Sequence, residues 1–97
     1  MKYLQTFESV QEPNYIIIYE KYKDDKYLFL LEKIESTYII NKVYDFKFND
    51  FRKPNIIKHE LTYDWFKTNK NIIKETNTET EANEFMNTYI EAEKYNL

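Results

Sequence analysis

Three apolar segments follow one another in residues 15–48, which have the sequence YIIIYEKYKDDKYLFLLEKIESTYIINKVYDFKF. Two short polar breaks divide this stretch, and within the segments large apolar side chains recur at every second position. A period of two is typical of β-strands, because successive side chains point to opposite faces of the sheet. We therefore predict strands at Tyr15–Tyr22, Tyr27–Glu35 and Tyr38–Phe48.

The breaks between these strands predict short turns and hence an antiparallel meander. The first break is Lys23 to Lys26 and the second is Ser36-Thr37. The chain has no glycine, so a two-residue turn in the first break would have to place Asp24 and Asp25 at positive φ. A four-residue loop is the alternative. In the third strand the alternation assigns one face to Tyr38, Ile40, Lys42, Tyr44, Phe46 and Phe48.

Residues on either side of this meander give weaker signals. Residues 2–12 fit either a helix or a strand, and Pro13 ends that segment. Asn49–Asn55 is predicted to be a loop, because Pro54 has no N–H to donate to a neighbouring strand. Residues 56–65 alternate apolar and polar side chains and predict another strand. A turn at 68–71 and a short strand at 72–75 follow.

The last element is predicted to be an amphipathic helix. Thr78 and Glu81 match a capping box, in which the threonine hydroxyl accepts from the backbone N–H of the glutamate. A single apolar stripe follows at helical spacing, made of Ala82, Phe85, Met86, Tyr89 and Ile90. We expect Phe85 and Met86 to fill the interface with the sheet, and Asn83 and Asn87 to lie on the opposite side.

Length and pattern together predict the fold class. A chain of 97 residues is long enough for one hydrophobic core, so we expect a single domain over residues 1–97. An antiparallel sheet needs at least one covered face, and the C-terminal helix can cover it. The prediction is an α+β domain with a four- to five-stranded antiparallel meander sheet and one C-terminal helix packed on one face.

The amino-acid composition excludes several classes of catalytic and cofactor-binding site. Without cysteine or glycine, the chain has no disulfide, thiolate metal site, phosphate-binding glycine loop or nucleophile elbow. His59 is the only histidine, and its place among Ile57 and Leu61 predicts a core or boundary residue. The neighbouring carboxylates of Asp24 and Asp25 are explained by a turn. We expect no enzymatic activity, no catalytic residue, no metal and no cofactor.

Charge and codon bias give expectations about origin and location. Residues 42–74 hold eight basic and four acidic side chains, whereas residues 75–97 hold six acidic and one basic. The abundance of Phe, Tyr, Met, Ile, Asn and Lys indicates an AT-rich genome, such as that of a low-GC bacterium, its phages, some archaeal viruses or a poxvirus. No apolar run approaches the roughly 20 residues that a membrane span needs. We expect a cytoplasmic protein, in the host cytosol if it is viral, with no membrane partner.

The aromatic content, 10 Tyr, 7 Phe and 1 Trp, exceeds what a core of this size can enclose completely. Two explanations are open: ordinary tyrosines with a buried ring and a solvated hydroxyl on a codon-biased chain, or a protein interface. Exposed aromatic rings and arginine are enriched at protein interfaces. Phe48, Phe51 and Arg52 lie in or beside the predicted loop, so we predict that they form a partner-binding patch. The favoured function is a non-enzymatic protein-binding module that inhibits or adapts a host or viral protein, or pairs as a homodimer. The alternative is a nucleic-acid-binding accessory domain that uses the basic, aromatic residues 42–74.

Overall fold

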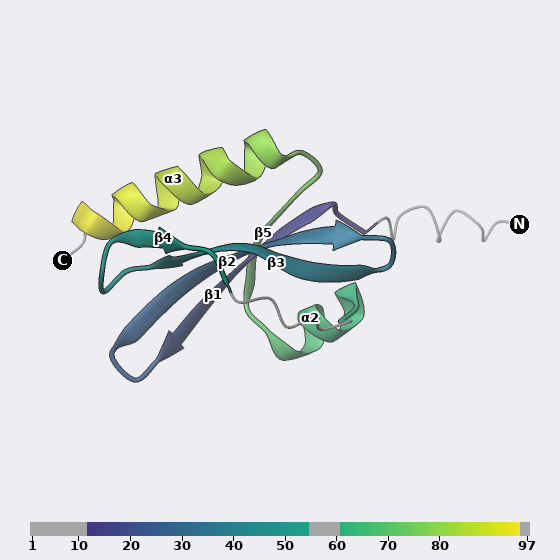
Figure 1. Cartoon of the computed structure of the whole chain (residues 1–97), viewed down its shortest axis with the longest axis horizontal. Helices are drawn as coiled ribbons and strands as arrows, with labels where there is room; N and C mark the ends of the chain where they lie inside the picture. The colour runs from purple at the N-terminus through teal and green to yellow at the C-terminus, as the bar shows by residue number, and fades with distance from the viewer. Residues whose placement is uncertain (1–11, 55–60, 96–97) are drawn as a thin grey trace, which may run out of the picture.

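A computed structural model describes residues 12–54 and 61–95. Its elements are β1 (Tyr15–Tyr22), β2 (Asp25–Ile34), β3 (Thr37–Asp45), β4 (Asp50–Arg52), α2 (Tyr63–Asn69), β5 (Ile72–Thr76) and α3 (Glu79–Tyr95). The strands form one antiparallel sheet in the order β4-β3-β2-β1-β5. Helix α3 lies on one face of the sheet and α2 lies at the other (Figure 1). The structure confirms the predicted α+β sheet with a C-terminal helix packed on it.

Two of the sequence predictions fall on residues that the structure does not describe. The choice between helix and strand for residues 2–12 concerns residues 1–11 almost entirely, and His59 lies in the segment 55–60. Neither prediction can be compared with the fold.

The two turns of the meander have two residues each, and the second lies one residue earlier than the predicted break. Only Lys23 and Asp24 separate β1 from β2, so Asp25 already belongs to a strand. Only Glu35 and Ser36 separate β2 from β3. The first residue of each turn takes a positive φ, 57° at Lys23 and 60° at Glu35. For the first turn the two-residue alternative is therefore right and the four-residue loop is wrong, but the positive φ falls on Lys23 and not on Asp24 or Asp25.

The positive φ of Glu35 predicts that glycine at this position would stabilise the protein. The left-handed conformation costs a residue with a Cβ roughly 1–2 kcal/mol, and glycine avoids that cost while losing more entropy on folding. We expect Glu35→Gly to raise the free energy of unfolding by about 0.5–1 kcal/mol in a urea titration. Ser36→Gly is the control, because Ser36 is not among the positive-φ residues. This variant should be less stable than the wild type. A loss of stability in both variants would contradict the strained turn.

A bulge in β3 separates its two halves. Leu31 pairs with Ile40 and Leu30 pairs with Lys42, which leaves Asn41 without a partner in the register. An extra residue shifts the alternation of side chains by one position. The predicted single face from Tyr38 to Phe48 is therefore wrong: Tyr38 packs on the side of α2 and Tyr44 packs on the side of α3.

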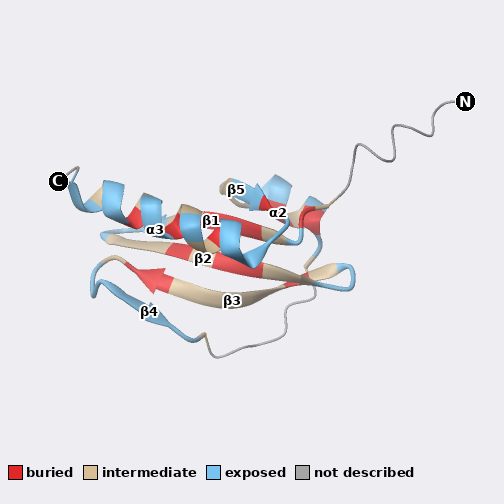
Figure 2. Cartoon of the chain, turned by 90° about the horizontal axis from the view of Figure 1, so that it is seen from above, coloured by how far each residue is buried: buried red, intermediate tan, exposed pale blue. Residues whose placement is uncertain are grey.

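Both faces of the sheet carry a buried cluster. The α3 face presents Ile17, Leu28, Leu30 and Tyr44 to the helix residues Ala82, Met86 and Ile90. The α2 face presents Ile16, Ile18, Leu31 and Tyr38 to Tyr63 and Phe66 of the shorter helix. Strand β1 lies inside the sheet and is covered on both faces. Side chains on either face are therefore buried, which explains why its apolar residues are consecutive in the sequence. Figure 2 shows buried stretches along β1 and β2, whereas β4 is exposed.

Helix α3 matches its predicted pattern with two differences. Its N-terminus is capped as expected, since the Glu81 N–H donates to Thr78 Oγ1 at 3.2 Å. Met86 is 0% exposed, whereas Phe85 is only half-buried, so Met86 occupies the centre of the interface. Asn83 is half-buried rather than fully on the solvent side, and its buried Oδ1 finds no hydrogen-bond partner among the described residues.

The strand predicted at residues 56–65 is wrong over its described part. Leu61 makes only an isolated bridge to Tyr38, and a helix begins at Tyr63. Thr62 starts this helix, because its hydroxyl accepts from the Trp65 N–H at 3.3 Å. The helix then continues to Asn69 through part of the predicted turn, and β5 follows close to the predicted position.

Candidate functional site

The predicted contact residues lie in the hairpin formed by β3 and β4. Strand β3 ends at Asp45, the turn comprises residues 46–49, and Asn49 takes a positive φ of 51°. The prediction of a strand through Phe48 was wrong, because the Asp45 carboxylate accepts the Lys47 N–H at 2.9 Å and closes a turn there. The prediction of a loop throughout 49–55 was also wrong, since Asp50–Arg52 pairs with the end of β3.

Asp45 organises this hairpin from within. Its residue surface is only 4% exposed, which is unusual for a carboxylate. Besides the Lys47 N–H, it faces Arg52, whose Nη2 lies 3.6 Å from Asp45 Oδ2. Arg52 therefore has a structural role: it compensates a buried negative charge that would otherwise be costly.

Arg52 also contacts the most exposed of the three predicted residues. The guanidinium carbon lies 4.8 Å from the centre of the Phe48 ring, and Lys47 Nζ lies 5.8 Å from the same ring. Phe48 is 59% exposed. A cation near an aromatic face is attracted to the ring quadrupole, so the arrangement holds an exposed ring at the tip of the hairpin.

Phe51 lies on the other face of the sheet. It pairs with Tyr44, whereas Arg52 pairs with Val43, so the two neighbours point to opposite sides. The Phe51 ring centre is 4.9 Å from that of Tyr44, and Lys42 Nζ lies 4.8 Å from the Phe51 ring. Phe51 thus extends the cluster beneath α3. The structure brings Phe48 and Arg52 together and separates Phe51 from them.

The face that carries Arg52 includes residues that were not singled out from the sequence. Val43 faces the α2 side beside Phe29, and Tyr27 pairs with Asp45 at the adjacent position. The ring centres of Tyr27 and Phe29 are 6.2 Å apart. Strand alternation in residues 27–35 places these two rings on the face opposite to Leu28 and Leu30. The alternation was visible in the sequence and could have identified Tyr27 and Phe29 as neighbours on one face.

Burial and neighbouring charges raise the pKa of the Tyr27 hydroxyl, which is neutral at physiological pH even at its ordinary value near 10. Desolvation raises the pKa of Tyr27, and the nearby carboxylates of Asp25 and Asp45 raise it further, with Arg52 acting in the opposite direction. The hydroxyl therefore remains a donor at physiological pH. Tyr27 offers a flat ring and one hydrogen-bond donor beside Arg52, a combination found at protein interfaces.

Two more tyrosines with raised pKa values serve the packing of α2. The Tyr38 hydroxyl donates to the Pro13 carbonyl, and the Tyr63 hydroxyl donates to Glu75 Oε2 at 2.6 Å. Burial raises the pKa of Tyr38, while burial and the Glu75 hydrogen bond raise the pKa of Tyr63 to about 12. Both hydroxyls are neutral and donate to a partner, so we assign them to the packing of the fold and not to proton transfer.

The described residues show neither a group of metal ligands nor a membrane-spanning helix. Within residues 12–54 and 61–95, no three acidic or histidine side chains are grouped as metal ligands would be. None of the described helices has the length and apolar character needed to cross a bilayer.

Comparison with known proteins adds no assignment. No family model, curated protein or solved structure matches the chain. The functional conclusion therefore depends on the geometry of the described residues.

Proposed function

We propose that this chain is a non-enzymatic protein-binding module whose contact surface is the hairpin surface, defined here as Tyr27, Phe48 and Arg52. The observation that carries the proposal is the Phe48 ring, which is 59% exposed yet has the Arg52 guanidinium 4.8 Å from its centre. An ordered, exposed ring loses little further freedom on binding, and Arg and aromatic residues dominate the binding energy of interfaces.

Contact through side chains fits this surface better than the addition of a strand. Strand β4 is the last strand of the described sheet on this side, and it has only three residues. Two of them, Asp50 and Arg52, are charged, and short charged edge strands oppose pairing with another chain. The partner is therefore expected to receive Phe48 in an apolar pocket rather than to extend the sheet.

Ion pairs within the basic residues 42–74 support a protein partner over nucleic acid. Three cations of the basic region face carboxylates: Lys47 lies 4.0 Å from Asp25, Arg52 lies 3.6 Å from Asp45, and Lys70 lies 2.6 Å from Glu20. A lysine or arginine that binds a phosphate releases a counterion condensed on the nucleic acid, and a cation already paired with a carboxylate supplies less of that driving force. The AT-rich coding bias is the basis for proposing a host factor as the partner of a viral or mobile-element protein.

Phe48→Ala is expected to weaken partner binding by about 2 kcal/mol or more while leaving the melting temperature nearly unchanged. The reason is that Phe48 is largely exposed, so its removal costs the fold little. Proteins retained from a host lysate by the immobilised wild type should be lost with Phe48→Ala, and titration calorimetry with the purified partner measures the loss. Asn87→Ala, an exposed change on α3, is the matched control and should retain the partner.

Two outcomes would reject the proposal, and a third would change the partner that it names. Equal retention by Phe48→Ala and the control would place the contact elsewhere. Concentration-dependent association in sedimentation that Phe48→Ala abolishes would make a second copy of the chain the partner. Micromolar binding to random oligonucleotides with a steep salt dependence would favour the nucleic-acid alternative.

A further inference from the structure

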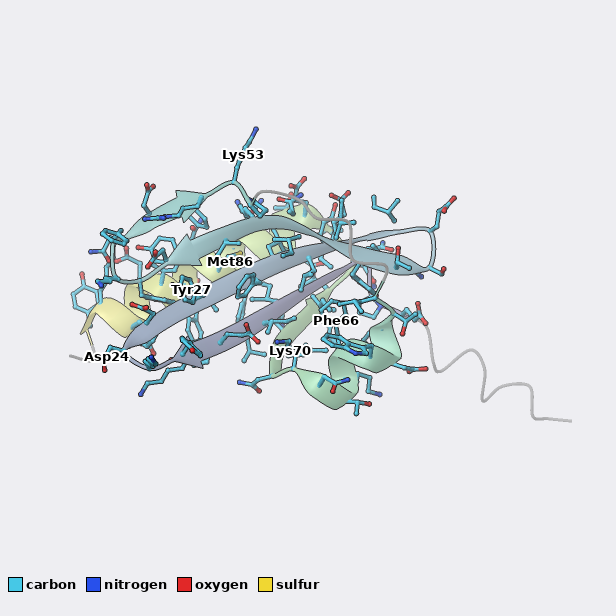
Figure 3. All side chains as sticks on the ribbon, turned by 60° about the horizontal axis from the view of Figure 1, so that its bottom comes forward. Asp24, Tyr27, Lys53, Phe66, Lys70 and Met86 are labelled. Atoms are coloured by element: carbon cyan, nitrogen blue, oxygen red, sulfur yellow. The ribbon has the colours of Figure 1, made fainter. Side chains whose placement is uncertain are left out.

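A groove lies between α2 and the α2 face of the sheet, on a different part of the molecule from the hairpin tip. It has a volume of about 400 Å³, within the range of small-molecule sites. Ile18, Leu31 and Ile40 line its sheet side, and Trp65 and Phe66 line its helix side. Figure 3 shows Phe66 on α2, and Lys70 directly after the helix, beside the sheet face that carries Tyr27.

One ion pair lies among these apolar walls. Lys70 Nζ lies 2.6 Å from Glu20 Oε2, and the same nitrogen lies 6.0 Å from the centre of the Trp65 ring. Both charged residues line the groove, and about a third of each side chain is exposed. An ammonium group has three N–H donors, and among the described residues Glu20 is the acceptor that it reaches.

We propose that this groove binds a small amphipathic carboxylate, with its apolar body against the sheet and Trp65 and its carboxylate accepting from Lys70. The apolar walls offer few hydrogen bonds to water, so an acyl chain or ring that displaces water from them gains free energy. The Lys70 ammonium supplies the single charged contact that would orient such a ligand. A ligand with a cationic end would pair with Glu20 instead and would be repelled by Lys70, since both side chains line the groove.

The Lys70–Glu20 ion pair allows a test in which two substitutions should change the ligand affinity in opposite directions. Glu20 competes with a ligand carboxylate for Lys70 and repels it, so removing the Glu20 charge should strengthen binding. Removing the Lys70 charge should weaken it. A cationic ligand would show the reverse order, and an uncharged ligand would respond to neither change.

Trp65 is the only tryptophan in the chain and lines the groove, so its fluorescence reports binding directly. The probes are dodecanoate below its micelle concentration, and dodecanol and dodecylammonium as uncharged and cationic counterparts. We expect a saturable change with dodecanoate. Lys70→Met should weaken dodecanoate binding about tenfold, the scale of one charge-assisted hydrogen bond, without changing dodecanol binding. Glu20→Gln should tighten dodecanoate binding about threefold.

Lys74→Met is the matched control, because Lys74 lies over an aromatic ring, 5.7 Å from the centre of Phe85, but outside the groove. It should bind dodecanoate as the wild type does, and so should Phe48→Ala, which separates this site from the hairpin surface. Circular dichroism melts establish that each variant is folded. No saturable response, equal dodecanoate affinity in Lys70→Met, or tighter binding of dodecylammonium would overturn the proposal. A response only to an apolar peptide would also overturn it and make the groove a peptide site.

Discussion

Met86→Ala is expected to lower the free energy of unfolding by about 2–5 kcal/mol, the range measured for truncating a buried Met, Leu or Ile. The Met86 side chain is 0% exposed and packs in the cluster between α3 and the sheet, together with Leu28 and Leu30. Its loss leaves a cavity that neighbouring side chains fill only in part. A domain of this size has about 5–15 kcal/mol in total, so the change is large. Urea titration followed by far-ultraviolet circular dichroism measures it.

Two further variants define what the Met86 result means. Asn87→Ala changes the next residue, which is exposed, and should alter the stability by less than about 0.5 kcal/mol. Met86→Leu keeps the volume and should cost less than about 1.5 kcal/mol. Similar losses for Met86→Ala and Asn87→Ala would contradict the orientation of α3 on the sheet.

Helix α3 could be predicted from sequence because its signals are local. Thr78 and Glu81 form the cap within four residues, and the apolar stripe repeats for three turns. The position of Asn83 was not predictable in the same way. Its burial depends on what lies beside the helix in space, and helical periodicity carries no information about that neighbour.

Helix α2 was missed because its sequence fits two periods. Tyr63 and Trp65 continue the alternation of the preceding residues, whereas Tyr63 and Phe66 have the spacing of a helical face. Burial of Tyr63 and Phe66 against Tyr38 decides between them, and this is a tertiary contact. The local clue was Thr62 followed by Asp64, an N-cap with an acidic residue in the first turn.

The candidate site was predictable in composition but not in arrangement. The exposure of Phe48 and Phe51 agrees with an excess of rings over the core capacity. Their separation depends on the turn that Asp45 closes, which leaves no periodic signal and makes Asp50–Arg52 a strand instead of a loop. In a strand residues 51 and 52 point to opposite faces, so only Arg52 stays with Phe48.

Phe66→Ala is expected to cost about 3–5 kcal/mol and to loosen the second layer of the fold. Phe66 is 5% exposed, and its ring makes edge-on contacts with Tyr38 and Trp65, at centre distances of 5.9 and 5.1 Å. A seven-residue helix is too short to be stable by itself, so its order depends on this packing. Trp65 fluorescence reports on α2, and circular dichroism reports on the whole fold.

The comparison of these two signals tests how the layers depend on each other. If the α2 face is part of one cooperative core, both signals in Phe66→Ala should move to lower urea concentration and still coincide. Thr68→Ala, at an exposed position of the same helix, should shift neither signal by more than about 0.5 kcal/mol. A fluorescence transition that precedes the circular dichroism transition would mean that α2 detaches separately. An unchanged stability would contradict the placement of Phe66 in the core, and with it the helical wall of the groove.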